Sequence, residues 1–310
     1  MHTIAIAPTP VGEPSLFSPE RPAWPQPDPA QALAPRSDAP VLVVRLLDGF
    51  QVWLDGEPVH DLPHGKPRNL LMLLLLQRRR PQPRARLCSQ LWPEAEAGSA
   101  RNSLNVALHR LRRTLGHGDL IRHGTAGYQL VCEGGVWLDV EQFLLHAEMG
   151  QLEDSSAQAA HPADAPAAPT APSASTPNAS NAHAISQYEA ALALYRTDLF
   201  SEGEEPAALA LDAQALRDRC NQVLDRLAAL REQAGDWHGC LRVALRHLSV
   251  DECNEAAHRR LMRCYASLGQ VQLADKQYRS CVAQLRVHMG LAPMAETVQL
   301  YRRITSRPAG

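Results

Sequence analysis

Apolar residues recur with the period of a helix between residues 98 and 116. The recurring residues are Leu104, Leu108, Leu111 and Leu115. Their spacings of four, three and four residues place them on one face of an α-helix. Ser99 is the expected N-cap of this helix, and Gly116 is the expected stop after its last turn. The pattern predicts an amphipathic helix whose leucine face belongs to a core.

The opposite face of this helix is polar and basic and carries no carboxylate. Its residues are Arg101, Asn102, Asn105, His109, Arg112 and Arg113. Arginine can donate two hydrogen bonds to guanine or phosphate, and asparagine can form two with adenine, so this composition suits a helix in the major groove of DNA. The alternative is a solvated basic helix on an ordinary helical protein, because basic amphipathic helices are common.

The segments before this helix predict a small sheet and two further helices. Residues 41–60 alternate β-forming runs with the pairs Asp48-Gly49 and Asp55-Gly56, which favour tight hairpin turns. Residues 66–80 predict a core helix of nearly continuous leucine, and its closing arginines suit a helix C-terminus. Residues 84–92 predict a short helix that ends before a proline.

Residues 120–131 predict two strands around a glycine-containing turn, with Arg122 and His123 near the tip. An antiparallel meander, three helices and a β-hairpin follow one another in the order of a winged helix. In that fold the helix before the hairpin reads the DNA. The sequence therefore predicts an α+β winged-helix domain.

The second half of the chain is predicted to be helical and repetitive. Gly235 and Gly269 lie 34 residues apart, as do Leu227 and Leu261, and this is the length of a tetratricopeptide repeat. Helices are expected over residues 187–195, 206–233, 237–248, 252–268, 270–288 and 294–306. The segment 136–143 is expected to continue into a helix that ends near residue 152. The second domain is therefore predicted to be all-α and tetratricopeptide-like.

Two segments have the composition of unstructured chain. Residues 1–40 contain ten prolines and few large apolar groups, so a disordered tail is expected. Residues 154–184 consist almost wholly of Ala, Pro, Ser, Asn and Asp, which predicts a low-complexity loop inserted between two helices of the second domain.

Charge and cysteine usage narrow the class of protein. Residues 41–131 hold 13 Lys and Arg against 7 Asp and Glu, whereas the whole chain holds 31 against 33. The seven cysteines are scattered and indicate neither a disulfide framework nor a zinc site. The N-terminus has no signal-peptide pattern, and the leucine run 70–76 is too short to span a bilayer. We expect a soluble cytoplasmic protein without a membrane partner.

Candidate chemistry is sparse. Gly65-Lys66 resembles the end of a phosphate-binding loop, but His60 stands at the position of its first glycine and Pro67 at that of its Ser or Thr. His258 and His288 have no second metal ligand at helical spacing and are interpreted as surface or packing histidines. We expect no enzymatic activity, no cofactor and no bound metal.

Residues 41–131 resemble the DNA-binding domain of OmpR/PhoB-type winged helices, in the form found in SARP-type bacterial transcriptional activators. The residues that carry this resemblance are Leu87, Leu91, Trp92, Ala100, Arg101, Asn102, Leu104, Leu108, Leu111, Arg112, Leu115, Gly116, Gly127, Tyr128 and Leu130. The helical part resembles the bacterial transcriptional activator domain (BTAD) of the same family, at Asp139, Phe143, residues 257–265 and residues 285–293. The domains expected are a disordered tail over 1–40, a winged helix over 41–133, and a BTAD over 136–306 with its insertion at 154–184.

The resemblance implies a regulator that binds promoter DNA. The helix at 99–115 would enter the major groove, where the residues expected to contact bases are Arg101, Asn102, Asn105 and His109. The residues expected to contact the DNA backbone or the minor groove are Lys66, Arg112, Arg113, Arg122, His123 and Thr125. A homodimer would bind direct repeats, and the helical domain would contact RNA polymerase.

The alternative function is an interaction scaffold. In that case the helical repeats bind a partner protein, and the winged helix serves for assembly without reading sequence.

Overall fold

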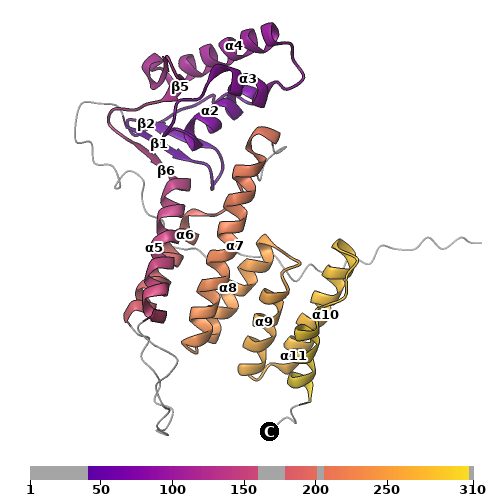
Figure 1. The fold of residues 1–310 in the computed structure, drawn as a ribbon. Coiled ribbons are helices and arrows are strands. Elements are labelled where there is room, and N and C mark those ends of the chain that lie inside the picture. Colours follow the sequence, from indigo (N-terminus) through magenta and orange to yellow (C-terminus); the bar gives the residue numbers. More distant parts are fainter. Residues whose placement is uncertain (1–40, 160–178, 201–205, 307–310) are drawn as a thin grey trace, which may run out of the picture.

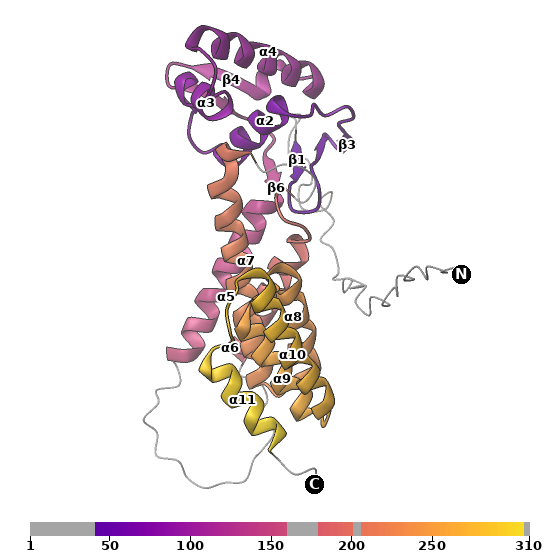
Figure 2. The same ribbon diagram turned by 90° about the vertical axis from the view of Figure 1, so that its right-hand side faces the viewer.

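A computed structural model of the chain describes residues 41–159, 179–200 and 206–306. It consists of a mixed α/β head and a helical domain, which Figure 1 and Figure 2 show one above the other. This is the predicted fold class, a winged helix followed by tetratricopeptide-like helices. The predicted disordered tail, residues 1–40, lies outside the described residues.

Three short strands open the head and form the predicted antiparallel meander. β1 (Leu42–Arg45) pairs with β2 (Gln51–Leu54), and β2 pairs with β3 (Glu57–Pro58). The turn between β2 and β3 consists of Asp55 and Gly56, whose φ angles are 53° and 84°. Two successive positive φ angles are what a two-residue hairpin turn of the right twist requires, and Asp-Gly adopts them at low cost.

A fourth strand completes this sheet and was not predicted. Residues 136–138, in the segment that was expected only to continue into a helix, form the strand β6 (Val136–Leu138), which pairs in parallel with β1. The strand order is therefore β3-β2-β1-β6. Trp137 and Leu138 are buried by this pairing, and the helix α5 (Asp139–Ala159) begins directly after it.

The three helices of the head lie beside the sheet. They are α2 (Lys66–Leu76), α3 (Arg84–Leu91) and α4 (Ala97–Leu115). The leucine helix α2 is buried along Leu70–Leu75, as its composition predicted, but it ends at Leu76, four residues before the expected end at residue 80. Arg78 lies beyond the end of the helix, and its guanidinium donates two hydrogen bonds to the Glu141 carboxylate of α5.

The helical domain follows as a row of antiparallel helices. They are α6 (Ala179–Leu194), α7 (Ala210–Gln233), α8 (Trp237–Val250), α9 (Glu255–Ser267), α10 (Val271–His288) and α11 (Ala295–Thr305), with a short 3-10 helix, η2 (Ala207–Leu209), before α7. Gly235 and Gly269 have φ angles of 70° and 74° and occupy equivalent turns after α7 and α9. The 34-residue repeat in the sequence is thus a structural repeat. None of the helices in the described parts of the chain has the length and apolarity that a bilayer crossing requires.

The loop predicted over residues 154–184 extends too far at both ends, because helices occupy part of that segment. Helix α5 continues to Ala159 and α6 begins at Ala179, so only residues 160–178 of this segment lie outside the described residues. Alanine favours helix, and a tertiary contact supports the extension. The Asp154 carboxylate is buried and accepts two hydrogen bonds from Arg226 of α7.

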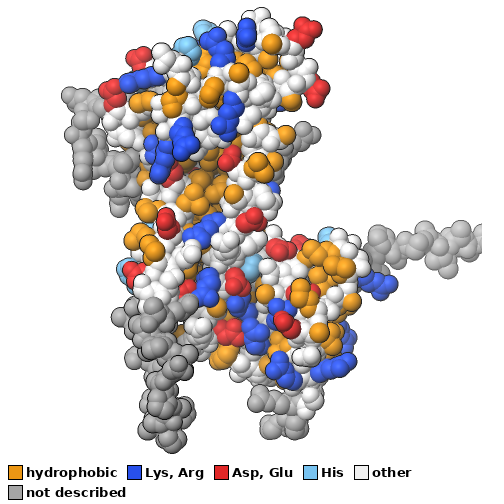
Figure 3. All heavy atoms as spheres, viewed as in Figure 1, with side chains coloured by type: hydrophobic (Ala, Val, Ile, Leu, Met, Phe, Trp, Pro, Cys, Tyr) orange, Lys and Arg blue, Asp and Glu red, His pale blue; other side chains and the backbone are white. Residues whose placement is uncertain are grey.

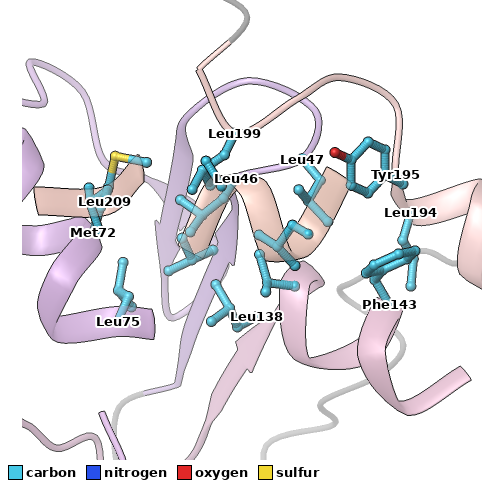
Figure 4. Packing of buried hydrophobic residues seen from close by; sticks show 14 of the residues in the cluster. Leu46, Leu47, Met72, Leu75, Leu138, Phe143, Leu194, Tyr195, Leu199 and Leu209 are labelled. Carbon is cyan, nitrogen blue, oxygen red and sulfur yellow. The ribbon is translucent and has the colours of Figure 1, made fainter. Parts of the chain in front are cut away.

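A single core joins the head to the helical domain. Its buried side chains run without a break from the sheet through α2–α4 to α5–α8. Figure 4 shows Leu46, Met72 and Leu138 of the head beside Phe143 and Leu209 of the helical domain. The two parts therefore share apolar contacts and are not separated by a flexible linker.

Asp139 lies at the centre of this junction. It is 2% exposed, and its carboxylate accepts hydrogen bonds from the backbone N–H groups of Leu46, Leu47 and Val140 at 2.7–2.9 Å. Burial raises the pKa of this carboxyl to about 6, although the backbone donors act in the opposite direction. The Leu47 carbonyl in turn accepts from the N–H groups of Arg196 and Thr197, which follow α6. The turn after β1 is thus held by both α5 and the end of α6.

We expect Asp139→Asn to lower the free energy of unfolding by about 1–3 kcal/mol, because an amide NH2 would replace a carboxylate oxygen that accepts backbone hydrogen bonds. Urea unfolding of the full chain, followed by circular dichroism, measures this effect. Asp48→Asn is the matched control. It removes a carboxylate charge from the turn that Asp139 holds, where Asp48 makes ion pairs of 3.8 Å with Arg45 and Arg196, and should cost less than about 1 kcal/mol. Equal stability of the two variants would contradict the role given to Asp139.

Candidate nucleic-acid interface

Helix α4 lies on the side of the head that faces away from the helical domain (Figures 1 and 2). Its buried residues are Ala100, Leu104, Ala107, Leu108, Leu111 and Leu115. The leucine stripe read from the sequence is therefore the face that packs against α2 and α3. Gly116 ends the helix with a φ of 70°, as predicted. Ser99 is not the N-cap, because the helix begins at Ala97 and the Ala100 N–H already bonds to the Glu96 carbonyl at 2.9 Å.

The outer face of α4 gathers most of the predicted reading residues. Arg101, Asn102, Asn105, His109 and Arg113 are all exposed on it. Asp and Glu are absent from α4. Figure 3 shows Lys and Arg side chains at the top of the head, where α4 lies. The face therefore offers hydrogen-bond donors and positive charge with no carboxylate of its own helix to repel DNA.

Arg112 lies between this face and the hairpin. It is half-buried, and its guanidinium donates a hydrogen bond to the Ile121 carbonyl at 2.8 Å. Ile121 is the first residue of β4 (Ile121–Gly124), which follows the short 3-10 helix η1 (Gly118–Leu120). Arg112 thus holds the hairpin against the last turn of α4. Its predicted contact with phosphate stays a prediction.

The hairpin forms as predicted and is anchored by one buried aromatic ring. β4 pairs with β5 (Gly127–Leu130) in antiparallel register, with His123 opposite Tyr128. The His123 ring lies 4.5 Å from the buried Tyr128 ring, centroid to centroid. Arg84, the first residue of α3, donates a hydrogen bond to the Tyr128 hydroxyl at 2.7 Å. The hairpin is therefore fixed to the start of α3 through Arg84 and to the last turn of α4 through Arg112.

The remaining predicted contacts are all exposed. Arg122 pairs with Glu133 at 2.6 Å on the surface, and Thr125 lies at the hairpin tip between β4 and β5. Lys66 is the first residue of α2, and its side chain is exposed. The Arg122–Glu133 pair is solvent-exposed, so it competes only weakly with a phosphate for the guanidinium.

Glycine is required at position 127. The backbone N–H and carbonyl of Tyr128 both bond to Gln82, at 2.9 and 2.7 Å, which brings the two segments into close contact. Gly127 has a φ of 133°, and a Cβ placed there would lie 2.2 Å from the Gln82 carbonyl oxygen. No other residue fits this approach without moving the backbone.

Two exposed residues of α4 were missed by the sequence analysis. Val106 and Arg110 lie on its outer face together with the predicted residues. Val106 was not among the predicted residues because only polar and basic side chains were considered for contacts with DNA. A helical projection with 100° per residue, centred opposite the leucine stripe, would have found both.

A hollow of about 500 Å³ separates α3 from the first turn of α4. Trp92 and Cys88 line it on the α3 side, and Ala100 and Arg101 on the α4 side. Arg101 therefore lies at the border of the outer face, beside this hollow, rather than at the centre of the face.

The described residues offer little else for chemistry. Within them no three His, Cys, Asp or Glu side chains gather as a metal site would require. His258 is buried, with one ring nitrogen on the Glu252 carbonyl at 3.0 Å and the other on the Gln277 amide at 2.6 Å. Burial lowers its pKa. It is a packing histidine, in agreement with the interpretation from sequence.

Two family models match the chain. The one described as "Transcriptional regulatory protein, C terminal" matches residues 63–130, from just before α2 to the end of β5. The one described as "Bacterial transcriptional activator domain" matches residues 167–305, which includes α6–α11. No curated protein sequence matches the chain.

Among solved structures, the chain is similar to Mycobacterium tuberculosis EmbR in complex with a low-affinity phosphopeptide. The TM-score is 0.62 at 19% sequence identity, and the match covers 86% of this chain and 65% of that one. At this identity the likeness concerns the fold, and the chain spans about two thirds of the EmbR chain. The C-terminal TPR-containing domain of a Plasmodium falciparum FK506-binding protein matches 55% of this chain and 89% of that one, at 15% identity and a TM-score of 0.35, which is too low to support an argument.

We expect Gly127→Ala to lower the free energy of unfolding by about 2–4 kcal/mol, because the new Cβ meets the Gln82 backbone at a φ that L-residues rarely adopt. Gly124→Ala in the same hairpin is the control. Nothing lies within 4 Å of the Cβ it would add, so its effect should stay within about 0.5 kcal/mol. Urea unfolding of both full-length variants measures the difference, and similar midpoints for the two would show that the Gln82 contact is not needed.

Proposed function

This chain belongs to the SARP-type bacterial transcriptional regulators, and on that basis we propose that it binds specific DNA sequences through α4 and the hairpin β4–β5. The observation that carries the proposal is the outer face of α4, which is exposed, basic and without Asp or Glu. A face of Asn, His and Arg offers donors and acceptors that match base edges in the major groove.

The packing of α4 supports a reading role. Its leucine face is buried against α2 and α3, and Arg112 ties its last turn to β4. A helix fixed on two sides presents its outer side chains in one orientation, which lowers the entropy cost of binding. We assign base contacts to Asn102, Asn105 and His109, with Arg101 at the border of the face.

We assign the positioning contacts to the surrounding cations and the hairpin. Lys66, Arg112 and Arg113 would bind phosphates, while Arg122, His123 and Thr125 would touch the adjacent backbone or minor groove. Contacts of this kind fix the orientation of the protein on the duplex but carry no sequence information.

The helical domain is free for protein contacts in this arrangement. It extends from the side of the head opposite α4, away from the proposed DNA face (Figure 1). We propose that the protein activates transcription as a homodimer on direct repeats, with half-sites about one helical turn apart, and that the helical domain contacts RNA polymerase.

Selection of binding sites from random DNA tests this function with the full-length protein. We expect enrichment of a direct repeat and an affinity for it at least about 10³-fold above that for scrambled DNA. Equal affinity for both, falling steeply with salt, would indicate a contact through charge alone. That result would favour the scaffold function, in which the helical repeats bind a partner protein.

We expect Asn102→Ala or Asn105→Ala to reduce affinity for the enriched site by about 1–3 kcal/mol and to relax preference at one base pair. Arg113→Ala should instead weaken enriched and scrambled DNA alike, because a phosphate contact does not distinguish sequences. Fluorescence anisotropy with labelled duplexes measures both effects. Arg242→Ala, which removes an exposed arginine from α8, is the control and should bind as the wild type does. Full discrimination between enriched and scrambled DNA by a double variant, Asn102→Ala with Asn105→Ala, would refute the assignment of the reading face.

A further inference from the structure

We propose that copies of this protein on successive direct repeats bind end to end through two apolar surfaces of the helical domain and form an open-ended array. The inference rests on the proposed function, because it concerns copies that are bound to direct repeats. It goes beyond a pair of copies, since a third copy joins the second through the same contact that joins the second to the first.

One surface is the outer face of α5, the first helix of the row. The inner side of α5 packs against α6 and α7 and buries Phe143, Ala147 and Asp154. The α5 surface consists of Leu145, Met149 and Leu152, which lie about 120–180° from those residues around the helix axis and are 37–63% exposed. Helix α5 is therefore apolar on both sides, although only one side has a partner among the described residues.

The other surface lies at the opposite end of the row, where α10 ends and α11 begins. The α10–α11 surface consists of Val287, Met289, Leu291 and Met294, which are 56–76% exposed. In Figure 1 α5 lies at one side of the helical domain and α10 and α11 lie at the other, and Figure 3 shows apolar side chains at both sides. A row of helical repeats that stays single needs polar outer faces on its terminal helices, whereas this row has apolar residues exposed at both ends.

Direct repeats require a contact between two different surfaces. Half-sites one helical turn apart, about 34–36 Å, place neighbouring copies on the same side of the duplex in the same orientation. Such copies are related by translation, which never brings a surface against its own equivalent. The α5 surface and the α10–α11 surface form a suitable pair, and every bound copy leaves one of them open to a further copy.

The row of helices has a length that fits this spacing. Helices α5, α7, α9 and α11 lie side by side, and packed helices are about 8–10 Å apart. Three such steps within one copy and a fourth across the contact give about 32–40 Å, a range that contains the separation of half-sites one turn apart.

The two surfaces also match in chemistry. Methionine on each of them adapts to the shape of a partner. Glu148 is exposed beside the α5 surface and Arg286 beside the α10–α11 surface, so opposite charges favour one orientation of the contact. Seven side chains make a small interface by the standard of stable complexes, which bury about 800 Å² per partner. The contact therefore holds together only copies that DNA has already brought side by side.

Duplexes with one, two and three copies of the enriched half-site test the array with the full-length protein. Electrophoretic mobility shifts count the bound copies and give the affinity of each. A copy should bind about ten- to hundredfold more tightly beside a bound neighbour than alone, and the third copy should gain as much as the second. Extra DNA of about half a helical turn between the half-sites turns the copies to opposite sides of the duplex and should abolish the gain.

Two double variants separate the surfaces. Leu145→Gln with Leu152→Gln alters the α5 surface, and Leu291→Gln with Met294→Gln alters the α10–α11 surface. Each variant should bind a single half-site as the wild type does and lose the gain from a neighbour. An equimolar mixture should regain it on two half-sites, because each variant keeps the surface that the other lacks. The mixture should not regain it for a third copy, since the middle copy needs both surfaces.

Leu273→Gln is the matched control, because it replaces an exposed leucine in the first turn of α10, far along the helix from Val287, and should keep the full gain. Thermal melting checks the fold, and glutamine is about as good a helix former as leucine. A variant that melts much earlier than the wild type would assign its surface to contacts within the chain and overturn the inference. Unchanged cooperativity in both double variants would also overturn it and leave the proposed function intact. Binding without any sequence selectivity would refute both.

Discussion

The buried carboxylate of Asp139 is the contact on which the arrangement of the two domains depends. It accepts the N–H groups of Leu46 and Leu47 after β1 and begins α5 at the same time. A carboxylate removed from water is stable only where it is supplied with donors, so the turn and the helix start must stay together. The Arg78–Glu141 pair and the shared apolar core act at the same junction. The head and the helical domain consequently form one body, and α4 keeps a fixed direction relative to α7–α11.

That fixed direction matters for the proposed regulator, because one surface must meet DNA while another meets protein. The leucines of α4 orient its outer face, and the Tyr128 ring with Arg84 and His123 orients the hairpin beside it. The close backbone contact at Gly127 then sets how far the hairpin lies from α3. Shape is therefore determined by apolar packing and backbone contacts, while the exposed positions are left to recognise bases.

Features encoded by local pattern could be predicted from the sequence, and features that depend on distant partners could not. The leucine period gave α4, and the Asp-Gly pairs gave the meander, because each depends on neighbouring residues. Strand β6 was missed because its partner β1 lies far away in the chain. Beyond the end of α2, Arg78 binds Glu141, and near the end of α5, Asp154 binds Arg226; both partners lie far away in the chain. Within the candidate site, exposure of the polar residues followed from the helix period, whereas Arg112's bond to Ile121 and Arg101's place beside the hollow needed coordinates.

The parallel pairing of β6 with β1 also fixes an order of events while the chain is being made. β1 emerges from the ribosome first, but its second neighbour follows only after all three helices and the hairpin of the head. Until β6 has been synthesised, one edge of β1 lacks its backbone partners. The N–H groups of Leu46 and Leu47 also lack their acceptor, the Asp139 carboxylate. Completion of the head thus coincides with the start of α5, so the DNA-binding part matures only when synthesis of the helical domain has begun.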